Sequence, residues 1–129
     1  MPVLPVAFAQ HLFHNVDYMA QPTKPLGEFE QVVLFTLLRL EDRAYGASIR
    51  REIELRTARR ISISPVYTTL ERLEAKGYVE SRLGDPTPQR GGRRKKFFHL
   101  TTEGARALKS AYSDFRLLVQ GLEDQLETI

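Results

Sequence analysis

Hydrophobic positions recur at helical spacing in two segments that follow residue 25. The first, EFEQVVLFTLLRL at residues 28–40, is apolar around most of its circumference, as expected of a buried helix at the centre of a small core. After Tyr45 and Gly46, the segment ASIRREIELRT at residues 47–57 alternates between inward positions such as Ile49 and Ile53 and outward ones such as Arg56. It predicts a second, amphipathic helix.

A third helix is predicted within SISPVYTTLERLEAKGY, residues 62–78. Ser64 is expected to cap it with Pro65 at the first helical position, and Gly77 is expected to end it in the left-handed conformation. An inner face of Val66, Leu70 and Leu73 packs on the core. The opposite face is short, hydroxyl-bearing and uncrowded, which is unusual for a merely solvated helix; it carries Ser64, Thr68, Glu71, Arg72 and Ala75, with Pro65 and Tyr67 on its flanks.

Two strand-like runs come next, YVESRL at residues 78–83 and KFFHL at residues 96–100. They predict a β-hairpin with a long tip rich in proline and glycine. Loops of about a dozen residues within a compact domain are usually functional or disordered. The cations of this tip fall within seven residues, at Arg90, Arg93, Arg94, Lys95 and Lys96.

The C-terminal segment, residues 102–129, predicts one long helix capped by Thr101 or Thr102, with Glu103 in its first turn. Its apolar positions alternate at spacings of four and three residues, which is the pattern of a heptad seam. We expect this seam to pair with a second copy of the chain; packing inside one chain, against Phe29, Val33 and the N-terminal arm, is the alternative. The seam consists of Leu108, Tyr112, Phe115, Val119, Leu122, Leu126 and Ile129.

Charge is concentrated in one part of the chain. The 129 residues suffice for one domain with an appendage, and 42% hydrophobic with 27% charged residues argues against global disorder. The net charge is only +3, yet six Arg and Lys stand against one acid between Arg82 and His99. This stretch therefore carries about +5 and the rest of the chain is close to neutral. Such a patch is expected of a nucleic-acid-binding surface, and the alternative is a solvated loop without a binding role.

Several classes of protein are disfavoured. The chain has no cysteine, which excludes disulfides and thiolate metal sites and fits the reducing cytoplasm, and no apolar run approaches the roughly 18 residues of a membrane span. The arm at residues 1–25 lacks the basic start of a secretory signal. His11, His14 and Asp17 have the spacing of one helix face, but without a second cluster we expect no metal there. His99 is expected to point outward from its strand, and no catalytic constellation is present, so we expect neither an enzyme nor a cofactor.

The order helix, helix, capped helix and β-hairpin is that of a winged helix-turn-helix, a mainly α fold with a β-hairpin wing (α+β). In this fold the third helix presents its first turns to base edges in the major groove of double-stranded DNA, and the wing meets phosphates or the minor groove. Arg72 has an alternative role as an ion-pair partner of a neighbouring acid such as Glu52, and Arg50 and Arg51 either touch phosphate or are solvated.

The sequence also resembles the PadR family of bacterial transcriptional regulators over residues 26–129. The resemblance is carried by LGEFEQVVLFTLLRL (26–40), the Tyr45 and Gly46 pair, SPVYTTLERLEAKGYV (64–79) and GDPTPQRGGRRKKFFHLTTEGARAL (84–108). It implies a homodimeric repressor acting on a palindromic operator, with a small-molecule inducer left open. The single C-terminal helix is similar to the short-tailed branch of that family, and the absence of tryptophan means that an aromatic drug sandwich is not carried over.

We therefore expect an N-terminal arm (1–25), a winged helix-turn-helix domain (26–101) and a C-terminal dimerisation helix (102–129). The alternatives are a winged-helix protein-interaction module and a non-specific architectural DNA binder. The expected DNA-binding residues are Ser64, Pro65, Tyr67, Thr68 and Arg72 on the recognition helix, and Arg90, Gly91, Gly92, Arg93, Arg94, Lys95 and Lys96 on the wing. The expected dimer residues are Leu108, Tyr112, Phe115, Val119, Leu122 and Leu126.

Overall fold

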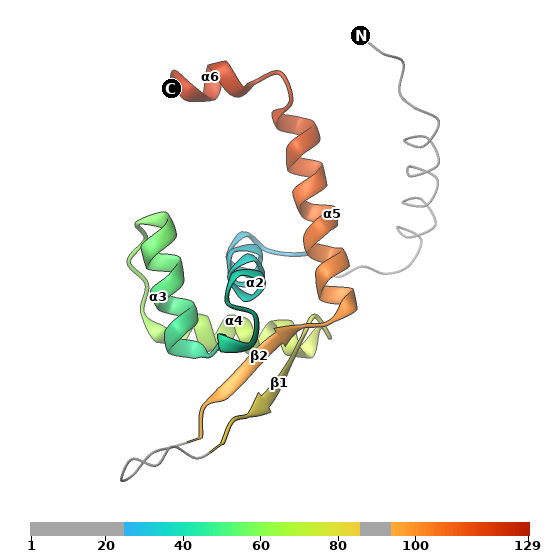
Figure 1. Ribbon diagram of the computed structural model, residues 1–129. Coiled ribbons are helices and arrows are strands. Elements are labelled where there is room, and N and C mark those ends of the chain that lie inside the picture. Colours follow the sequence, from blue (N-terminus) through green and yellow to red (C-terminus); the bar gives the residue numbers. More distant parts are fainter. Residues whose placement is uncertain (1–24, 86–93) are drawn as a thin grey trace.

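The computed structural model describes residues 25–85 and 94–129 (Figure 1). The predictions for the N-terminal arm, including those for His11, His14 and Asp17, lie outside the described residues. In chain order, the elements are α2 (Glu28–Leu40), the 3-10 turn η1 (Glu41–Arg43), α3 (Gly46–Thr57), α4 (Ile63–Ala75), β1 (Val79–Leu83), β2 (Lys96–Leu100), α5 (Thr102–Val119) and α6 (Glu123–Glu127).

Helix α2 lies at the centre of the fold, as its nearly uninterrupted apolar surface predicts. The helices α3, α4 and α5 and the strand β2 all pack against it. Val33 and Leu34 are fully buried, and Leu37 and Leu40 are buried beside them. The whole buried apolar core consists of Val33, Leu34, Leu37, Leu40, Ala44, Ile49, Ile53, Val66, Leu70, Leu73, Tyr78, Val79, Phe98 and Leu108.

The hairpin is joined to the helical body by a short third strand-like segment. Strands β1 and β2 pair antiparallel, with Val79 opposite Leu100. Tyr45 forms an isolated bridge with Phe97, and the Phe98 N–H donates to the Ala44 carbonyl at 2.8 Å. Figure 1 shows the hairpin extending away from the helices as a wing. Its root is therefore anchored to the segment that leads into α3.

Two local predictions about helix ends were wrong. The cap of α4 is Ser62 and not Ser64, so that Pro65 occupies the third helical position. Proline is tolerated there because the first turn of a helix needs no backbone donor. The C-terminal segment forms two helices and not one, because Gly121 has a φ of 87° between α5 and α6. Figure 1 shows α6 turned sharply from the direction of α5.

Other predicted ends are confirmed. Gly77 adopts a φ of 79° after α4, and the Thr101 hydroxyl accepts a hydrogen bond from the Gly104 N–H at 3.0 Å at the start of α5. Within the described residues, no helix combines the length and the apolar composition that crossing a bilayer requires.

Two ion pairs tie the start of α2 to the two ends of α4. The Lys76 ammonium lies 2.7 Å from the Glu30 carboxylate, and both side chains are largely buried. It also donates to the Pro25 carbonyl at 3.0 Å. At the other end, Arg59 in the α3–α4 turn donates through both terminal nitrogens to the Glu28 carboxylate. The start of α2 is thus tied to the C-cap of α4 and to the turn that precedes α4.

The close approach of α5 to the turn after α4 generates a stability prediction. A Cβ atom added to Gly104 would lie 2.0 Å from the Tyr78 carbonyl oxygen, which is backbone and cannot simply rotate away. We expect Gly104→Ala to lower the free energy of unfolding by roughly 1–3 kcal/mol, as overpacking typically does. Urea denaturation measures it, with the exposed Ser110→Ala in the same helix as control. Equal stability of the two variants would contradict the packing described here.

The Glu28 and Arg59 pair generates a pH prediction. Hydrogen bonds from Arg59 lower the pKa of the Glu28 carboxyl, and the charge of the guanidinium acts in the same direction. Because this pKa is lower in the folded than in the unfolded chain, the ionised pair stabilises the fold above the ordinary glutamate pKa, and this contribution is lost as pH falls through the folded value. We expect Glu28→Gln to lower the melting temperature at pH 7 and to match the wild type more closely in acid. The exposed Glu71→Gln is the control, and a difference that stays constant with pH would refute the prediction.

Candidate nucleic-acid interface

The recognition helix predicted from sequence is α4. Val66, Leu70 and Leu73 are fully buried, as expected. The predicted contact residues all lie on its exposed side; they are Ser64, Pro65, Tyr67, Thr68 and Arg72. Two serines, Ser62 and Ser64, and one threonine therefore present hydroxyl groups to solvent along the first turns of the helix.

The turn between α3 and α4 is fixed by a carboxylate of α3. The Glu54 side chain accepts a hydrogen bond from the Ile61 N–H at 3.1 Å and pairs with Arg50 at 3.2 Å. Ala58 takes the left-handed conformation, with a φ of 59°, where α3 ends. Arg50 is therefore engaged within its own helix, and the two helices of the helix-turn-helix are joined by a defined turn.

Tyr67 has a structural role as well as an exposed edge. A Cβ atom added to Gly46 would lie 2.4 Å from the Tyr67 hydroxyl, so the tyrosine packs across the first residue of α3. The ring remains 46% exposed. The glycine of the Tyr45 and Gly46 pair thus makes room for the recognition helix, which the sequence pattern alone did not reveal.

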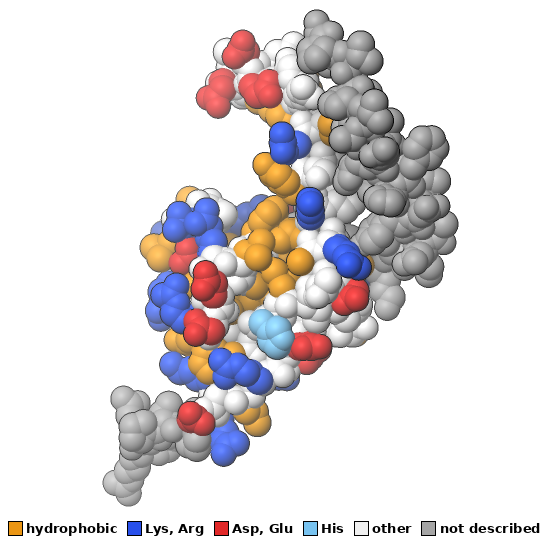
Figure 2. Space-filling view, turned by 45° about the vertical axis from the view of Figure 1, so that its right-hand side comes forward, with side chains coloured by type: hydrophobic (Ala, Val, Ile, Leu, Met, Phe, Trp, Pro, Cys, Tyr) orange, Lys and Arg blue, Asp and Glu red, His pale blue; other side chains and the backbone are white. Residues whose placement is uncertain are grey.

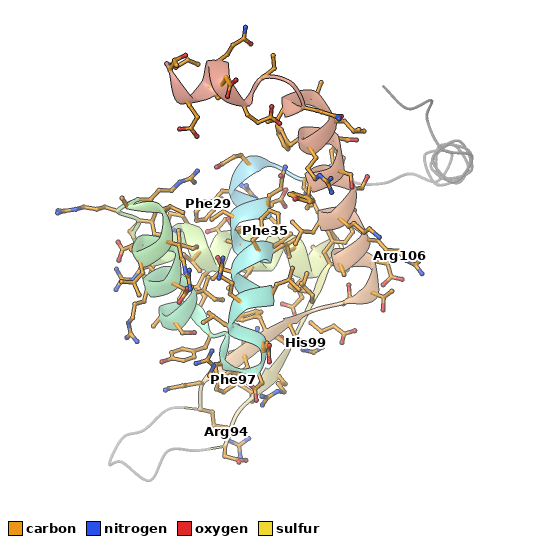
Figure 3. All side chains as sticks on the ribbon, turned by 45° about the horizontal axis from the view of Figure 1, so that its top comes forward. Phe29, Phe35, Arg94, Phe97, His99 and Arg106 are labelled. Atoms are coloured by element: carbon orange, nitrogen blue, oxygen red, sulfur yellow. The ribbon has the colours of Figure 1, made fainter. Side chains whose placement is uncertain are left out.

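The root of the wing carries exposed cations. Arg94, Lys95 and Lys96 are all exposed, and Figure 3 shows Arg94 beyond Phe97 in the direction of the tip. The other predicted wing residues, Arg90, Gly91, Gly92 and Arg93, lie outside the described residues. Two of these cations lie over aromatic rings: the Lys95 ammonium is 4.3 Å from the Tyr45 ring centroid, and the Lys96 ammonium is 5.6 Å from the Phe98 ring centroid.

Some cations on and near the interface form ion pairs with carboxylates, and others do not. Glu52 pairs with Arg56 at 2.8 Å and not with Arg72, and no ion pair involves Arg72 among the described residues. Arg59 and Arg60 were not predicted as site residues, although they immediately precede the amino end of α4. The signal that could have found them is this pair of adjacent arginines, a few residues before the predicted cap at Ser64. Both side chains are exposed, but Arg59 pairs with Glu28, whereas no ion pair involves Arg60 within residues 25–85 and 94–129.

Only part of the predicted dimer surface is exposed. Leu108 is 2% exposed and belongs to the core of its own chain, so its prediction as an interface residue was wrong. It faces inward because α5 packs its first turns on α2. The Tyr112 ring meets the Phe35 ring edge-on at 6.4 Å. Beyond it, the exposed apolar residues of the C-terminal segment are Phe115, Leu117, Leu118, Leu122, Leu126 and Ile129.

This apolar surface is continuous with part of α2. Phe35 and Leu38 of α2 are 41% and 54% exposed, and Phe115 and Leu118 of α5 are 55% and 70% exposed. Figure 2 shows hydrophobic side chains gathered between the helical body and α5. Val119 is half-buried. The turn at Gly121 means that the seam predicted for a single helix is divided between α5 and α6.

The His99 side chain points outward from β2, as predicted, and lies 3.1 Å from Glu80 on the paired strand. In the part of the chain that the structure describes, no three potential metal ligands come together.

Comparison with known proteins places these features in a family. The sequence profile of the PadR-like family of transcriptional regulators matches residues 34–110, whereas no curated protein sequence gives a significant match. The chain is similar to the structure of a transcriptional regulator from Clostridium thermocellum, with 25% identity, a TM-score of 0.60 and coverage of 74% of this chain and 86% of that one.

Two further structures share the fold. A PadR family transcription regulator from Clostridium difficile has 24% identity and a TM-score of 0.61, covering 76% of this chain and 98% of that one. A PadR family transcriptional regulator from Eggerthella lenta has 23% identity and a TM-score of 0.60, covering 97% and 100%. The winged helix-turn-helix predicted from the order of elements is confirmed. From the profile match over more than half of its length, the chain belongs to the PadR-like family of transcriptional regulators.

Proposed function

We propose that this protein regulates transcription as a homodimer that binds double-stranded DNA at a palindromic operator and represses the adjacent genes. The observation that carries the proposal is the junction at Tyr45 and Gly46. Tyr45 bridges to Phe97 of the wing, and Gly46 lies against Tyr67 of α4. The exposed face of α4 and the cations of the wing root are therefore neighbours on one surface.

In this proposal α4 enters the major groove. Ser64 and Thr68 offer short hydroxyl groups that donate to or accept from base edges, and Arg72 reaches a base or phosphate. The wing cations, Arg90 and residues 93–96, contact phosphates or the minor groove, while Gly91 and Gly92 let the backbone approach the duplex. Phosphate contacts supply affinity and register, and α4 supplies the sequence preference.

The dimer is proposed from the exposed apolar surface of α2, α5 and α6. Two copies related by a twofold axis would cover Phe35, Phe115 and Leu118, which would otherwise face water. A twofold dimer presents two recognition helices to half-sites about 34 Å apart, hence a palindromic operator. Repression, as opposed to activation, is proposed from the resemblance to the PadR family.

We assign no inducer in this proposal. The groove between α2 and α3, lined in part by Phe35, Arg39 and Arg56, has a volume of about 180 Å³. This groove is smaller than typical small-molecule sites, which measure roughly 300–1,000 Å³.

DNA binding is tested by fluorescence anisotropy with the duplex upstream of the gene and a scrambled duplex, each over a series of salt concentrations. We expect Arg94→Ala to weaken binding to both duplexes alike and to lower the slope of log K against log salt by about one. Lys109→Ala, which removes an exposed cation of α5 away from the wing, serves as the matched control. Absence of any salt-dependent binding would favour a protein-interaction module instead.

Sequence preference is tested with the same duplexes and Thr68→Ala. We expect the ratio of the two affinities to fall by roughly tenfold, since a base contact contributes about 1–3 kcal/mol of discrimination. The salt slope should stay unchanged, because no phosphate contact is removed. Equal wild-type affinity for both duplexes would contradict an operator-specific regulator at this locus and favour an architectural binder.

The dimer is tested by sedimentation equilibrium of Phe115→Asp. We expect the variant to be a folded monomer where the wild type is a dimer, because a charge at the centre of an apolar interface cannot be desolvated cheaply. Ser110→Asp places the same charge elsewhere on α5 and should leave the dimer intact. A Phe115→Asp protein with the mass of the wild type would refute this interface.

A further inference from the structure

Aromatic rings and cations alternate at the root of the wing. The rings of Tyr45 and Phe97 meet edge-on, with centroids 5.7 Å apart and planes at 75°. The Lys95 ammonium lies 4.3 Å from the Tyr45 centroid, and the Arg82 guanidinium lies 4.8 Å from the Phe97 centroid. Figure 3 shows Phe97 at the base of the hairpin, between the helical body and Arg94.

The backbone around the two rings is held by hydrogen bonds. The Ser48 hydroxyl accepts from the Tyr45 N–H at 2.9 Å and donates to the Arg43 carbonyl at 2.7 Å. The Gly84 N–H donates to the Lys95 carbonyl at 2.7 Å. A Cβ atom at Gly84 would lie 2.6 Å from the Phe97 ring, so only glycine leaves room for the ring here. Both rings therefore have defined positions.

The kind of group that a cation contacts decides whether its positive charge is neutralised. No ion pair involves Arg82 or Lys95 in the described ranges, whereas Arg50, Arg56 and Arg59 each pair with a glutamate. A carboxylate neutralises a cation, but an aromatic face attracts it without cancelling its charge. Lys95 and Arg82 are thus oriented while their positive charge stays available to a polyanion.

We propose that Tyr45 and Phe97 are positioning residues for DNA binding, which hold Lys95 and Arg82 ready to meet phosphates. The inference rests on the proposed function and adds residues that do not themselves touch DNA. Both cations remain exposed, so their outward N–H donors can bind a phosphate oxygen while the rings retain them. Holding a long side chain in place reduces the entropy lost when it binds.

The inference is tested by a double-mutant cycle of Tyr45→Leu and Lys95→Ala, measured with any duplex at low salt, because phosphate binding does not depend on sequence. We expect Tyr45→Leu to weaken binding roughly two- to tenfold, the range expected for ordering one long side chain. In the Lys95→Ala background the same change should have little effect, since the ring then has no ammonium to hold. Tyr45→Phe keeps the ring and should restore wild-type affinity and salt slope.

Phe29→Leu is the matched control, because Phe29 is an aromatic residue of α2 away from the wing (Figure 3). Its effect should be the same with and without Lys95. Independent, additive effects of Tyr45→Leu and Lys95→Ala in a wild type that binds DNA would overturn the positioning role alone. Failure of the wild type to bind any duplex would overturn the proposed function as well.

A second measurement does not depend on how well Tyr45→Leu folds. In the free wild-type protein the ε-methylene protons of Lys95 should be shifted upfield by the Tyr45 ring current in a proton–carbon correlation spectrum. Tyr45→Phe should retain this shift. Lys95 resonances at random-coil positions in the wild type would overturn the placement of the ammonium on the ring.

Discussion

The burial of α2 is the constraint on which the rest of the structure depends. Its apolar surface extends around most of the helix, and α3, α4, α5 and β2 each cover a part of it. Full burial of one side chain such as Val33 or Leu34 is worth about 1.5–3 kcal/mol, so the positions of the covering elements are strongly determined. The recognition helix, the wing and the C-terminal helix are therefore placed relative to one another by a helix that takes no part in the proposed DNA-binding surface.

Tyr45 and Gly46 bring the recognition helix and the wing together on one surface. Gly46 lacks a side chain where the Tyr67 hydroxyl comes close, and Tyr45 bridges to Phe97 in the hairpin. A two-residue segment thus touches both parts of the proposed DNA-binding face. This arrangement links the position of the wing to that of α4, although the two elements are separated along the chain.

The cations of the helical body and those of the wing root have different kinds of partner. Lys76 and Arg59 are paired with Glu30 and Glu28, and these pairs join α2 to the end of α4 and to the turn that precedes α4. Arg82 and Lys95 at the wing root lie over aromatic rings instead, so their charge is not neutralised. The exposed large apolar residues of α2 are Phe35 and Leu38. They lie on the side where α5 adds further exposed apolar groups.

The sequence by itself determined the elements whose signals are local. The helix at residues 28–40, the left-handed Gly77, the cap at Thr101 and the strand at residues 96–100 each depend on periodicity or on the conformation of one residue, and all were predicted. The break at Gly121 was not predicted, because the regular apolar spacing continues across it. The tertiary structure alone decided that Leu108 is a core residue, that Tyr67 packs on Gly46 and that Lys95 rests on Tyr45. These contacts join residues far apart in the chain, so they depend on which faces meet once α2 is covered, and no spacing within one segment encodes that.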